Sequence, residues 1–278
     1  MSRLLDRGCR FLLRLGTAAV FLSAALLAGR LLAAALPFLR AHAGAFLFSA
    51  DWRPTQGRFG VAAMLCASAA CAAGAVALAA PAALFAVLGA RELCGKRPAG
   101  LFLGLNRALS GMPSVLCGLV GMACIVPAID RRFSRLTAQS GGAGGLAAIL
   151  VLTLMLLPGL VCGFSDSLEP VSARDRRASA ALGATRVQTA FRCLLPAMRA
   201  PMGLHAANAL RRALGEATAV LLVSGNVVRF PALFASQRTL AASVVLEMGY
   251  AAGEHRAALF AIGLLLLALT ALLPAPGR

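Results

Sequence analysis

Long apolar runs recur along this chain of 278 residues, and charged or glycine-rich stretches separate them. A helix that crosses a bilayer needs about 20 consecutive, mostly apolar residues. Because the bilayer core holds no water for backbone groups to bind, such runs fold as helices that satisfy those groups internally. The sequence therefore predicts an all-α polytopic membrane protein with six transmembrane helices, over residues 15–36, 59–88, 101–126, 146–164, 202–223 and 257–273.

The composition fits a membrane protein and argues against binding of nucleic acid. Charged residues make up 13% of the chain, whereas soluble domains average about 25%. A net charge of +17 is a feature of nucleic-acid-binding proteins. However, the chain has one Trp and one Tyr for base stacking, and its arginines punctuate the apolar runs instead of lining one face. We expect the basic residues to set the membrane topology.

The distribution of basic residues predicts the orientation of the chain. Arginines and lysines gather before the first apolar run, after the second, and between the fourth and the fifth. Cytoplasmic loops carry the excess of basic residues, so we expect the N- and C-termini in the cytoplasm. We expect residues 1–58 to form an N-terminal transmembrane helix and an external loop. Residues 59–278 would form a five-helix core with a cytoplasmic loop at about 166–201.

The sequence predicts no catalytic, metal or cofactor site. Its eight cysteines form no C-x-x-C pair and its three histidines are scattered, so neither spacing indicates a metal site or a disulfide framework. A nucleotide-binding loop needs an earlier glycine and a Ser or Thr after Gly-Lys, but Arg97 follows Gly95-Lys96. The sequence also lacks the His/Asp/Ser constellation that a membrane hydrolase would carry. We expect a protein that is not an enzyme.

The polar interval between the fourth and fifth runs carries a specific pattern. An alanine-rich stretch leads to Gly183, and Leu195-Pro196 follow twelve and thirteen positions later. A glycine at positive φ ends a short helix, so we expect a helix–turn–helix, a compact knob that fits a cleft on a partner. An ordinary amphipathic cytoplasmic loop is the alternative interpretation.

This pattern resembles the EAA loop, the hallmark of the ABC importer permease family. Arg177 stands where that family has Glu, and Ser179 replaces an Ala. A salt bridge of opposite polarity at Arg177 would preserve the contact, or the contact would rest on other residues. The resemblance implies ATPase-coupling roles for Arg177, Ala178, Gly183, Ala184, Thr185, Leu195 and Pro196.

Four further segments resemble the PstC-type phosphate permeases of this family, in the same order over roughly residues 40–270. The segments contain Phe46-Leu47-Phe48, Trp52-Arg53-Pro54 and Phe59-Gly60; Gly111-Met112-Pro113-Ser114-Val115; Arg212-Ala213-Leu214-Gly215-Glu216-Ala217 and Ser224-Gly225-Asn226; and Thr239-Leu240 and Leu246-Glu247-Met248-Gly249. Each segment is short, and their common order makes the resemblance specific.

The resemblance implies a type I ABC importer permease of the bacterial inner membrane that translocates phosphate. The same architecture carrying molybdate, tungstate or sulfate is the alternative. The implied partners are a homodimeric ATP-binding subunit that hydrolyses the ATP, a second homologous permease subunit (PstA-like), a periplasmic phosphate-binding protein and the lipid bilayer. A membrane enzyme or sensor without transport is a third interpretation, and co-purification of an ATPase would exclude it.

Charged residues within the predicted helices are the first candidates for the substrate path, because such residues are costly in a membrane and usually functional. Arg212 and Glu216 are four residues apart, so on one helix they share a face and are able to pair. A guanidinium presents a fork of donors that matches phosphate oxygens, and Glu216 would neutralise it when the site is empty. A buried ion pair with a structural role is the alternative.

Arg107, Ser114 and Asn226 are further candidates for the substrate path. Arg107 precedes the predicted interruption at residues 111–114, and interrupted helices expose backbone donors that suit anions. A simple kink at Pro113 explains the same pattern. Ser114 and Asn226 add neutral polar groups.

Overall fold

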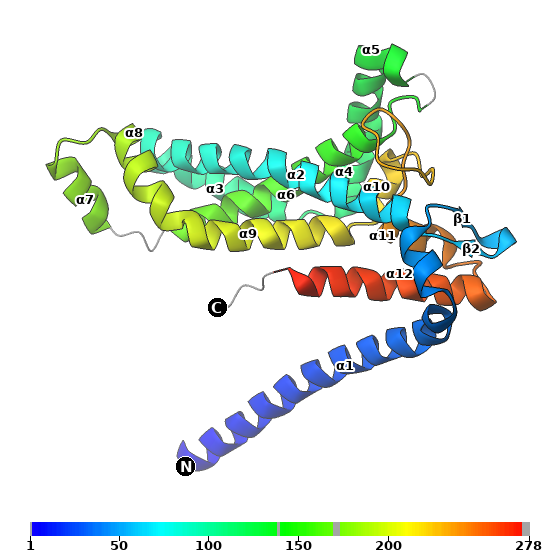
Figure 1. The fold of residues 1–278 in the computed structure, drawn as a ribbon. Helices are drawn as coiled ribbons and strands as arrows, with labels where there is room; N and C mark the ends of the chain where they lie inside the picture. The colour runs from blue at the N-terminus through cyan, green and yellow to red at the C-terminus, as the bar shows by residue number, and fades with distance from the viewer. Residues whose placement is uncertain (1, 138–139, 169–172, 274–278) are drawn as a thin grey trace.

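The computed structural model describes residues 2–137, 140–168 and 173–273, and within these ranges the protein is almost entirely helical (Figure 1). The α-helices are α1 (Ser2–Phe48), α2 (Ala62–Leu88), α3 (Lys96–Ser110), α4 (Ser114–Val120), α5 (Val126–Thr137), α6 (Gly145–Leu168), α7 (Ala173–Ala181), α8 (Arg186–Thr189), α9 (Leu195–Gly215), α10 (Thr218–Val223), α11 (Leu240–Glu247) and α12 (Gly253–Leu272). The predicted all-α class is confirmed. Residues 169–172 of the predicted cytoplasmic loop lie outside the described ranges.

Three π-helical turns and one small hairpin complete these elements. The turns η2 (Gly89–Leu93), η3 (Gly121–Ile125) and η4 (Ala190–Leu194) extend α2, join α4 to α5 and join α8 to α9. The hairpin pairs β1 (Trp52–Arg53) with β2 (Arg58–Phe59) around the 3-10 turn η1 (Pro54–Gln56).

Within the described residues, five helical segments are long and apolar enough to cross a bilayer. These are Cys9–Phe48, Ala62–Leu93, Ser114–Leu136, Gly145–Leu168 and Gly253–Leu272. They confirm a multi-pass membrane protein. The fifth predicted crossing is not among them, because it divides into α9 and α10 and because α9 carries Arg199, Arg211 and Arg212.

Two predicted boundaries are wrong. Helix α1 continues to Phe48 instead of ending near residue 36, because Phe38 and Phe46 are buried against the rest of the protein. Helix α5 covers the charged stretch that the sequence placed in a loop. It is amphipathic: Ile129 is buried while Arg131 and Arg132 are exposed, so one face packs and the other is polar. The interruption predicted in the third run is present, between α3 and α4.

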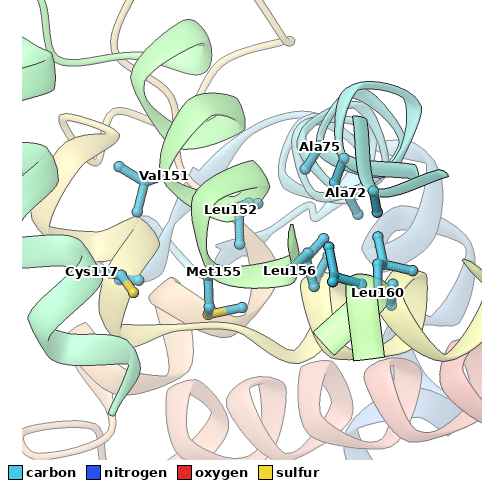
Figure 2. Close-up of a cluster of buried hydrophobic side chains, with 14 of the residues drawn as sticks. Ala72, Ala75, Cys117, Val151, Leu152, Met155, Leu156 and Leu160 are labelled. Carbon is cyan, nitrogen blue, oxygen red and sulfur yellow. The ribbon is translucent and has the colours of Figure 1, made fainter. Parts of the chain in front are cut away.

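The main core forms where α2 packs along α6 (Figure 2). The face of α2 that carries Ala72 and Ala75 is buried and meets Leu152, Leu156 and Leu160 of α6. Lipid is as apolar as a leucine side chain, so close van der Waals contact drives helix association in a bilayer. The small side chains of α2 allow that contact.

A second core cluster lies around α12, the C-terminal half of α1 and the hairpin. Phe38 and Phe46 of α1 and Trp52 and Phe59 of the hairpin are buried there. The N-terminal half of α1 stands away from the other helices (Figure 1), and apolar side chains such as Phe21 are mostly exposed on it. An exposed apolar surface of this size marks a membrane or protein contact.

The first and the last helix begin and end toward the same end of the molecule. In Figure 1 the start of α1 and the end of α12 both lie on the side of α7, and the hairpin lies on the opposite side. The start of α1 and the end of α12 therefore lie on the side of the predicted coupling loop.

Candidate translocation site

Two interrupted helices lie side by side. The interruption between α3 and α4 covers residues 111–113, and that between α9 and α10 covers residues 216–217. Ser114 begins α4 and Thr218 begins α10, and their hydroxyl oxygens lie 3.0 Å apart. Gly118 permits this approach, because a Cβ there would lie 2.9 Å from the Cα of Ala219. The first turns of α4 and α10 therefore meet at a pair of hydroxyl groups.

Glu216 occupies the second interruption. It follows the last residue of α9 and is extended, with φ −74° and ψ 119°. Its Oε1 accepts hydrogen bonds from Thr218 Oγ1 at 2.9 Å and from the backbone N–H of Ala219 at 3.1 Å. A carboxylate suits this position, because it satisfies free N–H groups at the start of a helix and opposes the helix dipole.

Arg212 and Glu216 do not share a helical face in this structure, contrary to the prediction, and they are not paired in it. Helix α9 ends at Gly215, between the two residues, and no ion pair joins them within the described part of the chain. Both residues nevertheless lie near Cys117 of α4. The two residues share a region but not a salt bridge.

Arg212 opens on a cavity of about 160 Å³ between α6 and α9, which we call the Arg212 cavity. Its lining residues are Leu156, Gly159, Leu160, His205, Asn208, Ala209 and Arg212. The last four lie on one face of α9, because residues three and four apart are neighbours on a helix. The sequence analysis did not single out His205 and Asn208, although their spacing from Arg212 indicates that the three side chains share one helical face.

Arg107 and Asn226 lie apart from this group. A guanidinium nitrogen of Arg107 is 3.6 Å from a carboxylate oxygen of Asp166, and both side chains are more than half exposed, so the pair stabilises the fold by at most about 1 kcal/mol. Asn226 follows α10 with φ 59°, and its Nδ2 donates to the carbonyl of Leu221 at 2.8 Å. In this structure Asn226 shapes a loop, while Ser114 and Glu216 gather at the helix interruptions.

The segment of α7, its turn and α8, here called the coupling segment, has the predicted helix–turn–helix geometry. Gly183 follows α7 with φ +76°. Thr185 then caps α8: its Oγ1 accepts from the N–H of Gln188, whose Oε1 accepts from the N–H of Thr185. The hydroxyls of Ser179 and Thr189 lie 2.9 Å apart and join the two helices.

The surface of the coupling segment is open to a partner. Leu182 is 89% exposed, and a hollow of about 430 Å³ beside it is lined by Ala178 and Ala184, among others. Arg177 is exposed on α7. Leu195 and Pro196 begin α9, so a continuous helical path leads from α8 through η4 into the helix of Arg212.

An ion pair ties the coupling segment to the end of α2. Arg176 Nη2 lies 3.1 Å from Glu92 Oε1, and the Glu92 side chain is 10% exposed. Arg186 donates to the backbone carbonyl of Glu92 at 3.4 Å. The sequence analysis noted the charge cluster that contains Glu92 but not this contact, because the partners are far apart in the chain.

We expect Gly183→Ala to weaken coupling without unfolding the protein. The positive φ of Gly183 costs an L-residue about 1–2 kcal/mol, while the space around it is open, so the cost falls on the turn alone. ATPase activity stimulated by the assembled permease should fall several-fold. Gly203→Ala is the matched control, because Gly203 lies inside α9 with open space around it; equal losses in both variants would contradict the prediction.

A buried carboxylate that the sequence analysis did not single out lies at the hairpin end of the molecule. Glu247 of α11 is 6% exposed. It accepts from Trp52 Nε1 at 2.9 Å and Arg238 Nη1 at 2.5 Å, and it lies 2.8 Å from His255 Nε2. The network joins the hairpin, the loop before α11, and α12. The signal in the sequence was an acidic residue inside an apolar stretch.

These features define a class of protein. The protein has several helices able to span a membrane, two interrupted helices, a cavity with one arginine in its lining and an exposed helix–turn–helix. This combination is typical of a membrane permease. Within the described residues, no group of three or more His, Cys, Asp or Glu side chains is placed to hold a metal ion.

Comparison with known proteins identifies the family. No protein-family model matches the chain. It is 30% identical over 231 residues to the probable ABC transporter permease protein YqgH of Bacillus subtilis, covering 81% of this chain and 73% of that protein. It is 29% identical over 253 residues to the phosphate transport system permease protein PstC of Mesorhizobium japonicum, covering 84% and 76%. It is 26% identical to PstC of Haemophilus influenzae over 251 residues, covering 84% and 79%.

The chain belongs to the ABC transporter permease family, with PstC-type permeases among its relatives. The resemblance drawn from the short motifs is confirmed over about four fifths of the chain. Permease subunits of this family are transport components, so the protein is a membrane transport subunit and not an enzyme.

Proposed function

We propose that the protein is the PstC-like subunit of an ATP-driven importer and that it translocates inorganic phosphate. The observation that carries this proposal is the similarity to phosphate permeases over most of the chain. The Arg212 cavity supplies the chemistry, because guanidinium donors match the oxygens of a phosphate ion and bind them in a bidentate way.

The interruption at Glu216 suggests how Arg212 is controlled. In this structure Glu216 is held by Thr218 and Ala219 at the start of α10. Arg212 lines the cavity, and no described residue forms an ion pair or hydrogen bond with its guanidinium. When α10 shifts relative to α9, Glu216 leaves this cap and pairs with Arg212, which releases the anion. Ser114 follows the same movement through its contact with Thr218.

The finer architecture follows from the same assignment. Helices α9 and α10 together form the interrupted fifth of the six crossings of a type I permease, with both termini in the cytoplasm of a bacterial inner membrane. Residues 1–58 are an N-terminal transmembrane helix and a periplasmic loop, and residues 59–278 are the five-helix permease core. The coupling segment, followed by Leu195 and Pro196, docks a homodimeric ATPase. A second, PstA-like permease completes the path, and a periplasmic phosphate-binding protein delivers the ion.

The direct test is uptake of radiolabelled phosphate by proteoliposomes that contain the complete complex. We expect uptake that requires ATP and the binding protein, together with co-purification of the ATPase. Transport of molybdate, tungstate or sulfate in place of phosphate would overturn the substrate and leave the subunit role in place. An assembled complex that moves no oxyanion would overturn the transport function proposed here.

A further inference from the structure

The polar side chains that line the Arg212 cavity are all able to donate hydrogen bonds. Arg212 carries a guanidinium, Asn208 an amide N–H₂ and His205 a ring N–H, and the lining residues include no carboxylate. The cavity holds about 160 Å³, the liquid volume of about five water molecules. Donors without a negative partner in a small cavity favour an anion of the size of a tetrahedral oxyanion.

Asn208 has a fixed orientation in this cavity. Its Oδ1 accepts a hydrogen bond from Arg211 Nη1 at 3.0 Å, so the acceptor end of the amide is engaged. Within the described chain, no residue accepts a hydrogen bond from Nδ2 of Asn208. The amide therefore offers its donors on the face of α9 that lines the cavity.

The ring of His205 is placed by packing. It lies against Gly163 of α6, where a Cβ would come within 2.4 Å of His205 Nδ1. It also meets the edge of Phe164, with 6.4 Å between the ring centroids. No hydrogen bond from either ring nitrogen to another described residue is present. Packing holds the ring in place, while its nitrogen atoms have no hydrogen-bond partner among the described residues.

His205 lies seven residues before Arg212 on α9, about 10 Å along the helix axis. This direction leads toward the coupling segment, which precedes α9 in the chain. An ion that leaves Arg212 toward the coupling segment would therefore meet Asn208 and then His205. Neutral donors hold an anion less tightly than a guanidinium, and successive sites of moderate affinity allow an ion to move on.

We propose that His205 and Asn208 form a second subsite for the transported oxyanion, between Arg212 and the end of the protein that carries the coupling segment. This inference rests on the proposed function and deepens it, because it assigns specificity-determining residues to the path beyond Arg212.

The decisive variant is Asn208→Asp in the complete reconstituted complex. An aspartate keeps the acceptor for Arg211, so a purely structural role of Asn208 predicts a stable, active protein. A subsite for an anion predicts the opposite, because the new carboxylate repels the ion and competes for Arg212. We expect phosphate uptake to fall at least tenfold, while ATPase co-purification and binding-protein-stimulated ATP hydrolysis stay within twofold of the unmodified complex.

His205→Phe is the second variant, since it keeps an aromatic ring against Gly163 and removes the ring N–H. We expect a roughly tenfold loss of uptake with intact ATP hydrolysis. Ala200→Asp is the matched control for the added carboxylate, because Ala200 is an exposed residue of α9 outside the cavity; its uptake should stay within twofold.

The outcomes separate this inference from the proposed function. If the unmodified complex takes up phosphate and both variants match it, the subsite is wrong and the proposed function stands. If the unmodified complex carries a different oxyanion, the same two variants must reduce uptake of that ion, or the subsite is wrong as well. If it carries none, both proposals fail together.

Discussion

Arg212→Ala should lower ATP-driven phosphate uptake by at least about a hundredfold while leaving the complex assembled. Each hydrogen bond to a charged group contributes about 1.5–3 kcal/mol, and about 1.4 kcal/mol is a factor of ten. A bidentate guanidinium loses two such bonds on truncation. The side chain is exposed in the isolated subunit, and no described residue bonds to its guanidinium, so the fold does not depend on it. Uptake into proteoliposomes measures the effect.

Two further variants make this result specific. Arg212→Lys keeps the charge and loses the planar fork, so we expect an intermediate loss of about tenfold. Arg199→Ala removes the same side chain from an exposed position on the same helix, outside the cavity, and should retain normal uptake. If Arg212→Ala transports like the unmodified complex, or if Arg199→Ala is equally impaired, Arg212 is not the anion site.

Glu247→Gln should destabilise the subunit by about 3 kcal/mol. The carboxylate is 6% exposed and holds Trp52, Arg238 and His255 together. Removing one partner of a buried ion pair costs about 3–5 kcal/mol, because the remaining charge is left without compensation. Glutamine has nearly the same shape as glutamate, so no cavity forms. The loss of stability therefore comes from the lost charge and hydrogen bonds. Denaturation of the purified subunit in detergent measures the change in the free energy of unfolding.

Glu254→Gln is the control for this prediction. Glu254 begins α12 and is exposed, and surface substitutions of this kind change stability by about 0.5 kcal/mol or less. Similar stability of the Glu247 and Glu254 variants would show that the network around Glu247 does not hold the hairpin to α11 and α12.

The coupling segment shows which features of the fold local sequence patterns can predict and which they cannot. A glycine after an alanine-rich stretch predicted a helix that ends at a positive φ, and Gly183 has φ +76°. Such a turn depends on residues within one or two helical turns of each other, so the sequence contains all the information required. The ion pair between Arg176 and Glu92 depends on how α2 meets the segment, and no local pattern specifies it.

The candidate site was likewise predictable from the sequence only in part. The sequence supplied Arg212 and Glu216, because charged residues in apolar runs stand out. It also suggested that the two would pair across one helical turn. The structure places the end of α9 between them and turns Glu216 to α10. A helix end depends on packing, here of α9 against α2 and α6, as well as on propensity, so the spacing of four residues did not determine the contact.

By itself, the sequence determined that this protein is a helical membrane permease, because a bilayer demands long apolar helices and because the family motifs follow one another along the chain. Only the tertiary structure decided which face of α9 meets α6, how His205 and Asn208 come to share a cavity with Arg212, and where Glu247 finds its partners. The physical reason is that apolarity is a property of each segment, whereas a binding site or a buried ion network requires side chains from several segments to meet in space.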